Sequence, residues 1–243
     1  MDGMRIPRRA AGAVLAAALL AGCSAGESGP SGPNGPQEPH AAPGASKKPD
    51  PTRIPGLGAL QRKIPAHSTQ VVTVYGTSRS APDATVALYT RSGTAWHRTA
   101  TWPAHNGRRG WTPDHHEGDK RSPVGVFTLS DAGGVLSSPG VRLPYTRSTL
   151  FRAPSWWKPA YQHDFDLVIA IDYNRVKGTS PLDPTRPLGR ARGGGIWLHL
   201  DHGSGTSGCV SLPKTAMRTL LRTLDPARHP VIVMGDRATL AKG

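Results

Sequence analysis

Short runs of β-branched and aromatic residues recur along the chain between residues 70 and 235. Gly, Pro, Asn and Asp are concentrated between these runs, which is the pattern of short strands joined by turns. The predicted strands are Val71–Tyr75, Thr85–Tyr89, Trp96–Ala100, Val124–Leu129, Leu167–Ile171, Ile196–Leu198 and Val231–Met234. The pattern therefore predicts a mainly β, sandwich-like body.

One segment, residues 213–224, has the periodicity of a helix instead. Its large apolar residues fall on one helical face, at Met217, Leu220, Leu221 and Leu224. Pro213 would lie near the first turn, where its missing amide hydrogen costs nothing. The sequence therefore predicts one principal helix in an otherwise β domain.

The first 22 residues have a different pattern, in which basic residues precede an apolar run over residues 10–21. A run of this length is too short to span a hydrocarbon layer of about 30 Å and is typical of a signal peptide. The segment Leu20-Ala21-Gly22-Cys23 resembles the bacterial lipoprotein processing box. We therefore expect cleavage before Cys23 and a lipid anchor on its thiol. An ordinary secretory signal cleaved near Ala25 is the alternative.

Residues 23–63 are dominated by Gly, Pro, Ser, Ala and Glu, as in the stretch 29–36. Such a composition buries too little apolar surface to offset the entropy of ordering, so it predicts a disordered tether. Residues 65–237 follow as one domain that is long enough to form a hydrophobic core. The expected organisation is therefore a lipoprotein signal peptide (1–22), a tether (23–63) and a folded domain (65–237).

The chain has a formal net charge of +14. A charge this positive first suggests nucleic acid as a partner. An exported protein has little access to nucleic acid, whereas the cell envelope is polyanionic through lipid head groups and wall acids. We therefore expect non-specific attraction to the envelope and no nucleic-acid partner.

The candidate chemistry lies at the second of the two cysteines, Cys23 and Cys209. Lipidation of Cys23 would exclude a disulfide in the mature monomer and leave Cys209 as a free thiol. A lone cysteine is most often a small buried apolar residue. Cys209, however, follows a turn of small residues and lies ten residues after His199, near the end of a predicted strand. An imidazole can remove the thiol proton and lower the pKa of the thiol, so Cys209 is the candidate nucleophile.

Four segments carry a family resemblance: Thr206–Ser211 with His199 upstream, Lys120–Phe127, Asp172–Arg175 and Leu224–Pro230. Together they are similar to the L,D-transpeptidase catalytic domain family, which cross-links peptidoglycan, over residues 65 to 236. The commonest form of that family has a second histidine directly before the Gly-Cys pair, where this chain has Ser207. The serine at this position removes an auxiliary donor. The motif of this chain resembles that of the branch with a Thr-x-Gly-Cys motif and a short His-to-Cys spacing.

The resemblance implies a cysteine-dependent acyl transfer on peptidoglycan stem peptides, with a role in cell-wall biogenesis and cell shape. His199 would take the proton of Cys209, and the thiolate would attack the diamino acid carbonyl of a donor stem. The terminal D-residue would then leave, and an amine of a neighbouring stem would resolve the acyl-enzyme. The resemblance implies no cofactor. It does imply that carbapenems inhibit the enzyme.

The resemblance also implies roles for the backbone near these residues. The amides of Ser207, Gly208 and Cys209 would stabilise the oxyanion. The third member of the triad in this family is often a backbone carbonyl next to the histidine, and Asp201 is an acidic alternative.

Two other functions remain open. An L,D-carboxypeptidase would form the same acyl-enzyme and let water resolve it. A non-catalytic lipoprotein would bind peptidoglycan without reacting, and the missing second histidine favours this alternative. The processing box and the tether imply a protein outside the cytoplasm, lipid-anchored to the cell membrane and facing the cell wall, and all three functions suit that location.

Two histidine-rich segments, His115–Glu117 and His199–His202, suggest a metal, but neither forms a closed ligand set at zinc spacing. We therefore expect no metal site. Trp156 and Trp157 lie in a polar, proline-punctuated stretch where exposed aromatic rings would suit the edge of a sugar or peptide groove. Packing of both rings beneath the loop is an equally good interpretation.

Overall fold

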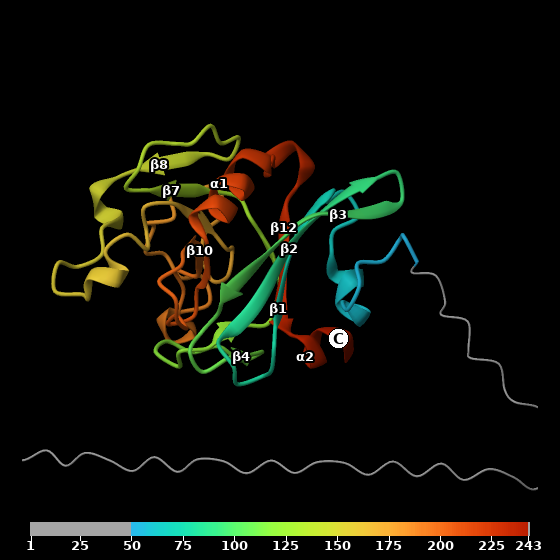
Figure 1. The fold of residues 1–243 in the computed structure, drawn as a ribbon, viewed down its shortest axis with the longest axis horizontal. Helices are drawn as coiled ribbons and strands as arrows, with labels where there is room; N and C mark the ends of the chain where they lie inside the picture. Colours follow the sequence, from blue (N-terminus) through green and yellow to red (C-terminus); the bar gives the residue numbers. More distant parts are fainter. Residues whose placement is uncertain (1–49, 243) are drawn as a thin grey trace, which may run out of the picture. The chain divides into compact units, whose positions relative to one another are not determined.

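A computed structural model describes residues 50–242 of the chain. Ten strands form one mixed sheet in the order β6-β12-β1-β2-β3-β11-β10-β9-β7-β8, and β4 pairs separately with β5 (Figure 1). The strands are β1 (Gln70–Gly76), β2 (Asp83–Ser92), β3 (Ala95–His105), β4 (Trp111–Thr112), β5 (Ser122–Pro123), β6 (Gly125–Thr128), β7 (Ala132–Gly134), β8 (Tyr145–Arg147), β9 (Val168–Ala170), β10 (Trp197–Leu200), β11 (Val210–Leu212) and β12 (Val231–Asp236). The helices are α1 (Lys214–Thr223) and α2 (Arg237–Lys242), with 3-10 turns η1 (Gly58–Lys63), η2 (Thr149–Phe151), η3 (Pro159–Tyr161), η4 (Arg190–Arg192) and η5 (Pro226–Arg228).

The mainly β class predicted from the sequence is confirmed, and each of the seven predicted strands overlaps a strand of the sheet. The predicted helix is α1, which begins directly after Pro213. The sequence pattern missed β4, β5, β7, β8 and β11, each two or three residues long. Strands this short contain too few residues to show an alternating pattern.

Strand β1 is buried on both faces. Val72 and Val74 belong to the main core, whereas Val71 and Tyr75 belong to a second apolar cluster on the opposite face. Because successive side chains of a strand point to opposite faces, one strand can serve both clusters. Its pairing with β12 is parallel and its pairing with β2 is antiparallel, so β1 is a central strand of the mixed sheet.

The second cluster includes residues that precede the expected domain boundary. Ile54, Leu57 and Leu60 are buried, with exposed fractions of 6% or less. The turn η1 lies against α2 so closely that a Cβ at Gly58 would be 2.3 Å from the carbonyl oxygen of Ala241 (Figure 1). The expected boundary between residues 63 and 65 is therefore wrong. The Gly/Pro-rich composition of the segment concealed three apolar residues at the spacing of a 3-10 turn.

The expected signal peptide (1–22), the lipidation site Cys23 and the tether as far as residue 49 lie outside the described residues. Between residues 50 and 242, no helix has both the length and the apolar character needed to cross a bilayer.

The sheet positions the candidate chemistry through the parallel pairing of β10 with β11. Leu198 lies opposite Val210 and His199 lies opposite Ser211, so Cys209 comes directly before the paired residues of β11. Helix α1 follows β11 and packs its apolar face into the main core beside β10 (Figure 1). Both strands are thus held by the core rather than by a surface loop.

We expect Leu57→Ala to destabilise the folded domain by about 2–5 kcal/mol, because truncation of a fully buried leucine leaves a cavity. Denaturant unfolding of the full chain measures this loss. Leu150→Ala is the matched control, since Leu150 is 79% exposed and its truncation should change the free energy of unfolding by no more than about 0.5 kcal/mol. Equal small effects at the two positions would show that the segment around Leu57 does not belong to the folded domain.

Candidate active site

Cys209 and His199 line the same pocket, which has a volume of about 680 Å³. The other lining residues come from three loops: Arg108 after β3, the segment between η2 and β9, and the turn between β10 and β11. They are Arg108, Trp156, Trp157, Lys158, Tyr161, Asp164, Phe165, His202, Ser204, Gly205, Thr206 and Ser207.

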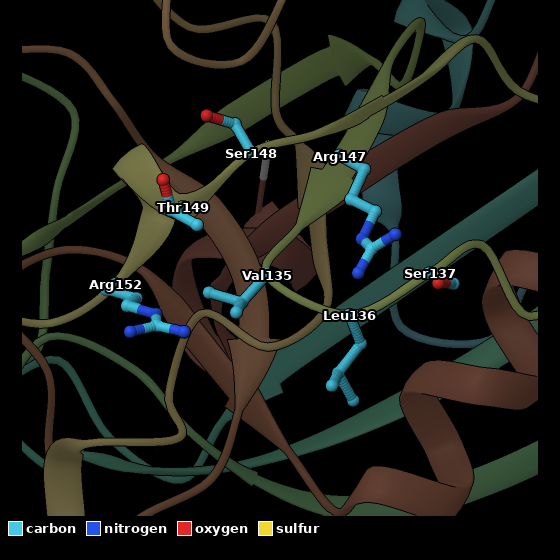
Figure 2. Close-up of a pocket in the computed structure, with 7 residues that line it drawn as sticks. All are labelled: Val135, Leu136, Ser137, Arg147, Ser148, Thr149 and Arg152. Carbon is cyan, nitrogen blue, oxygen red and sulfur yellow. The ribbon is translucent and has the colours of Figure 1, made fainter.

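A second hollow of about 550 Å³ lies around β8 and η2. Figure 2 shows that Arg147 and Arg152 lie on either side of Val135 in this hollow. Its lining contains no thiol, imidazole or carboxylate. The nucleophile and titratable groups that acyl transfer requires are therefore found in the first pocket and not in this one.

The thiol of Cys209 is held by the backbone before and within β10. The amide of Trp197 donates to Sγ at 3.4 Å, and the thiol donates to the carbonyl oxygen of Gly195 at 3.5 Å. Within residues 50–242 the thiol makes no hydrogen bond to His199. Cys209 remains partly exposed, so a ligand in the pocket can reach it.

Burial raises the pKa of the Cys209 thiol to about 11, against the lowering effect of the Trp197 amide. The negative charge of Asp164 acts in the same direction as burial. The expectation of a lowered thiol pKa is therefore wrong for this state of the site. The physical reason is that burial disfavours the thiolate more than the Trp197 amide favours it, and the imidazole of His199 is neutral and adds no positive charge.

His199 lies on β10 and is 2% exposed. Burial lowers the pKa of its imidazole to about 4, so the ring is neutral near pH 7. Its Nδ1 lies 2.8 Å from the carbonyl oxygen of Leu200, which can only accept. The Nδ1 atom therefore carries the proton, and Nε2 presents a lone pair that can act as a base.

A hydroxyl network fixes the turn before Cys209. The hydroxyl of Thr206 donates to the carbonyl of Cys209 at 2.6 Å and accepts from the amide of Gly208 at 3.1 Å. Ser122 donates to the carbonyl of Gly208 at 2.7 Å. Of the three predicted oxyanion donors, the Gly208 amide is thus already bound. The amides of Ser207 and Cys209 have no acceptor within the described residues.

Gly208 has φ +148°, a backbone conformation that side chains disfavour. A Cβ at this position would lie 3.1 Å from the carbonyl oxygen of Arg121 and 3.2 Å from Cδ1 of Ile196. The turn therefore requires glycine for its backbone conformation and for the close approach of the backbone at Arg121 and the side chain of Ile196.

Asp201, the acidic alternative as a partner of His199, contacts other groups. Its carboxylate accepts from the hydroxyl of Ser211 at 2.6 Å and from the amide of Gly203 at 3.1 Å, and lies 2.8 Å from Nδ1 of His105. Burial raises the pKa of Asp201, but these hydrogen bonds outweigh it and bring the pKa below its usual value. Asp201 ties β10 to β3 and β11 and does not orient His199.

The pocket also contains an imidazole–carboxylate pair that the sequence analysis did not identify. Nδ1 of His202 lies 2.9 Å from Oδ2 of Asp164, and each side chain is only 5% exposed. Burial raises the pKa of Asp164 to about 6, although His202 favours the charged carboxylate. The rings of His202 and His199 are stacked, with centroids 6.1 Å apart and planes inclined by 16°. His202 was considered only as a metal ligand, and Asp164 had no sequence signal.

Aromatic side chains form the rim of the pocket. Trp156 is 83% exposed and Trp157 is 41% exposed, and both line the pocket. Trp157 makes edge contacts with Tyr161 and Phe165, whereas Trp156 projects into solvent. Of the two interpretations of this stretch, the structure favours exposed aromatics at the edge of a groove.

The histidine-rich segment His115–Glu117 does not line this pocket, although Cε1 of His115 would lie only 3.6 Å from a Cβ at Gly208. His115 is buried, with Nδ1 3.0 Å from Oδ1 of Asp119, and its ring contacts Tyr173 edge-on. In the part of the chain from residue 50 to residue 242, no three histidine, cysteine or acidic side chains are grouped as a metal site would require.

Comparison with known proteins assigns residues 79–233 to the family described as the L,D-transpeptidase catalytic domain (YkuD). No curated protein matches the sequence. Among solved structures, the chain is similar to Bdellovibrio bacteriovorus Bd1075, with 16% sequence identity and a TM-score of 0.38. The match covers 72% of this chain and about half, 52%, of that one. At this TM-score the similarity carries no argument, so the assignment depends on the family match. Since that match spans more than half of the sequence, the chain belongs to the L,D-transpeptidase catalytic domain family, whose members are cysteine-dependent enzymes acting on peptidoglycan.

Proposed function

We propose that the protein is an L,D-transpeptidase that forms peptidoglycan cross-links through an acyl-enzyme on Cys209, with His199 as the general base. One observation carries the proposal. The thiol of a partly exposed cysteine and a neutral imidazole with an available Nε2 lie in one pocket, on segments fixed by the pairing of β10 with β11. This combination provides the nucleophile and the base that thiol acyl transfer requires.

In the first half-reaction, Nε2 of His199 takes the thiol proton as sulfur attacks the carbonyl of the donor diamino acid. The C–S bond forms, and the carbonyl oxygen becomes an oxyanion. His199 then donates the proton to the nitrogen of the terminal D-residue, the C–N bond breaks and a thioester remains. Because both partners begin neutral, the proton transfer accompanies the attack and does not precede it.

The amides of Ser207 and Cys209 are the oxyanion donors in this mechanism, because neither has an acceptor within the described residues. The amide of Gly208 is bound to the hydroxyl of Thr206 and instead fixes the shape of the turn. Donors held in place by the fold need no reorganisation when the charge develops, which is the source of their catalytic value.

In the second half-reaction, an amine of a neighbouring stem peptide replaces sulfur on the acyl group. The pocket of about 680 Å³, with Trp156 and Trp157 on its rim, has room for more than a water molecule beside the thioester. This observation favours an acceptor peptide.

The L,D-carboxypeptidase alternative shares every earlier step. The non-catalytic alternative, a lipoprotein that binds peptidoglycan, predicts no acyl-enzyme.

The proposed location is the outer face of the cell membrane, with the protein anchored through a lipid on Cys23. The support for this proposal is the processing box at residues 20–23 after an apolar run of signal-peptide length. The positive net charge of +14 suits a polyanionic envelope.

We expect one covalent adduct on Cys209 when the purified full chain reacts with a carbapenem. Mass spectrometry of the intact protein should show the mass increase in the wild type and none in Cys209→Ala. His199→Ala should react at least about 10²-fold more slowly than the wild type, because it lacks the general base.

Disaccharide tetrapeptides then identify the reaction. Dimers support the transpeptidase, shortened tripeptides alone support the carboxypeptidase, and an unmodified thiol with intact substrate contradicts both.

We expect alkylation of Cys209 by iodoacetamide to accelerate continuously from pH 7 to pH 10, by about tenfold per pH unit, because the thiolate is the reacting form. The sign follows from the raised pKa of about 11, below which the thiolate fraction still increases with pH. Peptide mapping separates Cys209 from Cys23. A rate that reaches a plateau between pH 6 and pH 8 would indicate a thiolate–imidazolium pair and contradict the neutral resting state.

We expect Cys23→Ala to abolish incorporation of labelled fatty acid when the full chain is produced in a bacterial host. The variant should be released into the soluble fraction or accumulate unprocessed. Cys209→Ala is the control, since it removes the other thiol and should be labelled like the wild type. Fatty acid still attached to the Cys23→Ala chain would contradict the lipid anchor.

A further inference from the structure

We propose that the His202–Asp164 pair receives the proton of the acceptor amine, and thereby allows an amine to resolve the acyl-enzyme. The inference deepens the proposed transpeptidase function and depends on it. It assigns a catalytic role to two residues outside the Cys209–His199 pair, both of which line the same pocket.

The chemistry of the second half-reaction requires a second base. An alkyl amine with a pKa of about 10.4 is almost entirely an ammonium ion near neutral pH and has no lone pair for attack. His202 takes one proton from the ammonium. The amine then attacks the thioester, the C–N bond forms and the C–S bond breaks. The second nitrogen proton passes through His199 to the departing sulfur, and His202 releases its proton to solvent. Without His202, His199 would have to accept both protons of the acceptor nitrogen.

The hydrogen-bond pattern of His202 suits this task. Its Nδ1 is engaged by Asp164 at 2.9 Å, which leaves Nε2 as the ring nitrogen available to a ligand in the pocket. The ring is stacked on that of His199, so the two bases lie side by side along the pocket. An acceptor nitrogen that approaches the thioester of Cys209 can therefore meet both imidazoles.

Asp164 is held in place from two directions. Its backbone carbonyl accepts from the amide of Leu200 at 2.9 Å, which fixes it beside the end of β10. Its carboxylate is buried and pairs with His202. A buried carboxylate on the far nitrogen of an imidazole fixes the tautomer and stabilises the imidazolium. His199 has only a carbonyl partner, so it lacks this stabilisation.

The charges of the pocket favour a proton on His202 over one on the bound amine. Lys158 and Arg108 line the same pocket, and positive neighbours disfavour any further cation there, but His202 has the carboxylate of Asp164 on its ring to offset this effect. The raised pKa of Asp164, about 6, shows that its negative charge is costly where it lies and is relieved by a positive imidazole. The other titratable groups near His202 are His199, Tyr161 and Asp201.

The test compares two acceptor amines with the full chain. The first is a stem peptide whose amine is protonated near neutral pH, and the second is hydroxylamine, which is largely unprotonated there and needs no second base. His202→Gln removes the base. Asp164→Asn can keep the hydrogen bond to His202 but removes the charge. For each variant, the rate of cross-linking and the rate of hydroxamate formation are divided by the rate of carbapenem acylation.

In both variants we expect the ratio for the stem peptide to fall by about 10²-fold, in the range for loss of a general base. The ratio for hydroxylamine should change much less. His163→Gln is the matched control, because His163 pairs with Asp166 at 3.1 Å but is 81% exposed and does not line the pocket. It should behave as the wild type.

Four outcomes would overturn the inference. Equal losses with the two amines would indicate that the pair only maintains the shape of the pocket, and unchanged cross-linking would exclude any role. If the wild type forms only the tripeptide, water and not an amine resolves the acyl-enzyme. That result would contradict the inference but not the acyl-enzyme on Cys209. A wild-type thiol that no carbapenem modifies would instead contradict the proposed function itself, and the inference with it.

Discussion

The parallel pairing of β10 with β11 is the constraint on which the site depends. A parallel connection usually needs about a dozen residues or more, whereas residues 201–209 make this one. So short a connection must turn sharply, and Gly203 and Gly208 have the positive φ angles that such turns require. The hydroxyls of Thr206 and Ser122 then fix the last turn before Cys209. The same geometry that closes the connection brings the thiol beside β10 and leaves backbone amides unbound.

Burial by the surrounding core gives this site its electrostatic character. It raises the pKa of Cys209 and lowers that of His199, so both groups are neutral at rest. A neutral thiol is protected from unselective reaction with oxidants and electrophiles, because the thiolate is the reactive form. As a consequence, the attack of the sulfur must be coupled to the transfer of its proton. The proposed reaction therefore requires that the substrate carbonyl is bound and aligned with the sulfur.

The sequence predicted the parts of the molecule that depend on local pattern. Seven strands and α1 are long or periodic enough to be recognised, and Cys209 and His199 are separated by only ten residues, so their proximity follows from one turn. Asp164 and His202 are 38 residues apart, and no local signal joins them. The packing of Leu57 was hidden because composition averages over a segment, and α2 has only six residues. The pKa of the thiol depends on burial, which a sequence does not display.

The two imidazoles of the pocket differ in their partners, and this difference divides their proposed roles. If a carboxylate faced Nδ1 of His199, it would favour the imidazolium and reduce the fraction of neutral base available to the thiol. The carbonyl of Leu200 fixes the same tautomer without adding a negative charge. The carboxylate of Asp164 instead faces Nδ1 of the neighbouring ring, His202, and would stabilise the imidazolium that forms when this ring accepts a proton. The two imidazoles of the pocket therefore have different partners, a carbonyl oxygen for His199 and a carboxylate for His202. A reaction that removes a thiol proton first and an ammonium proton later can use one imidazole for each proton.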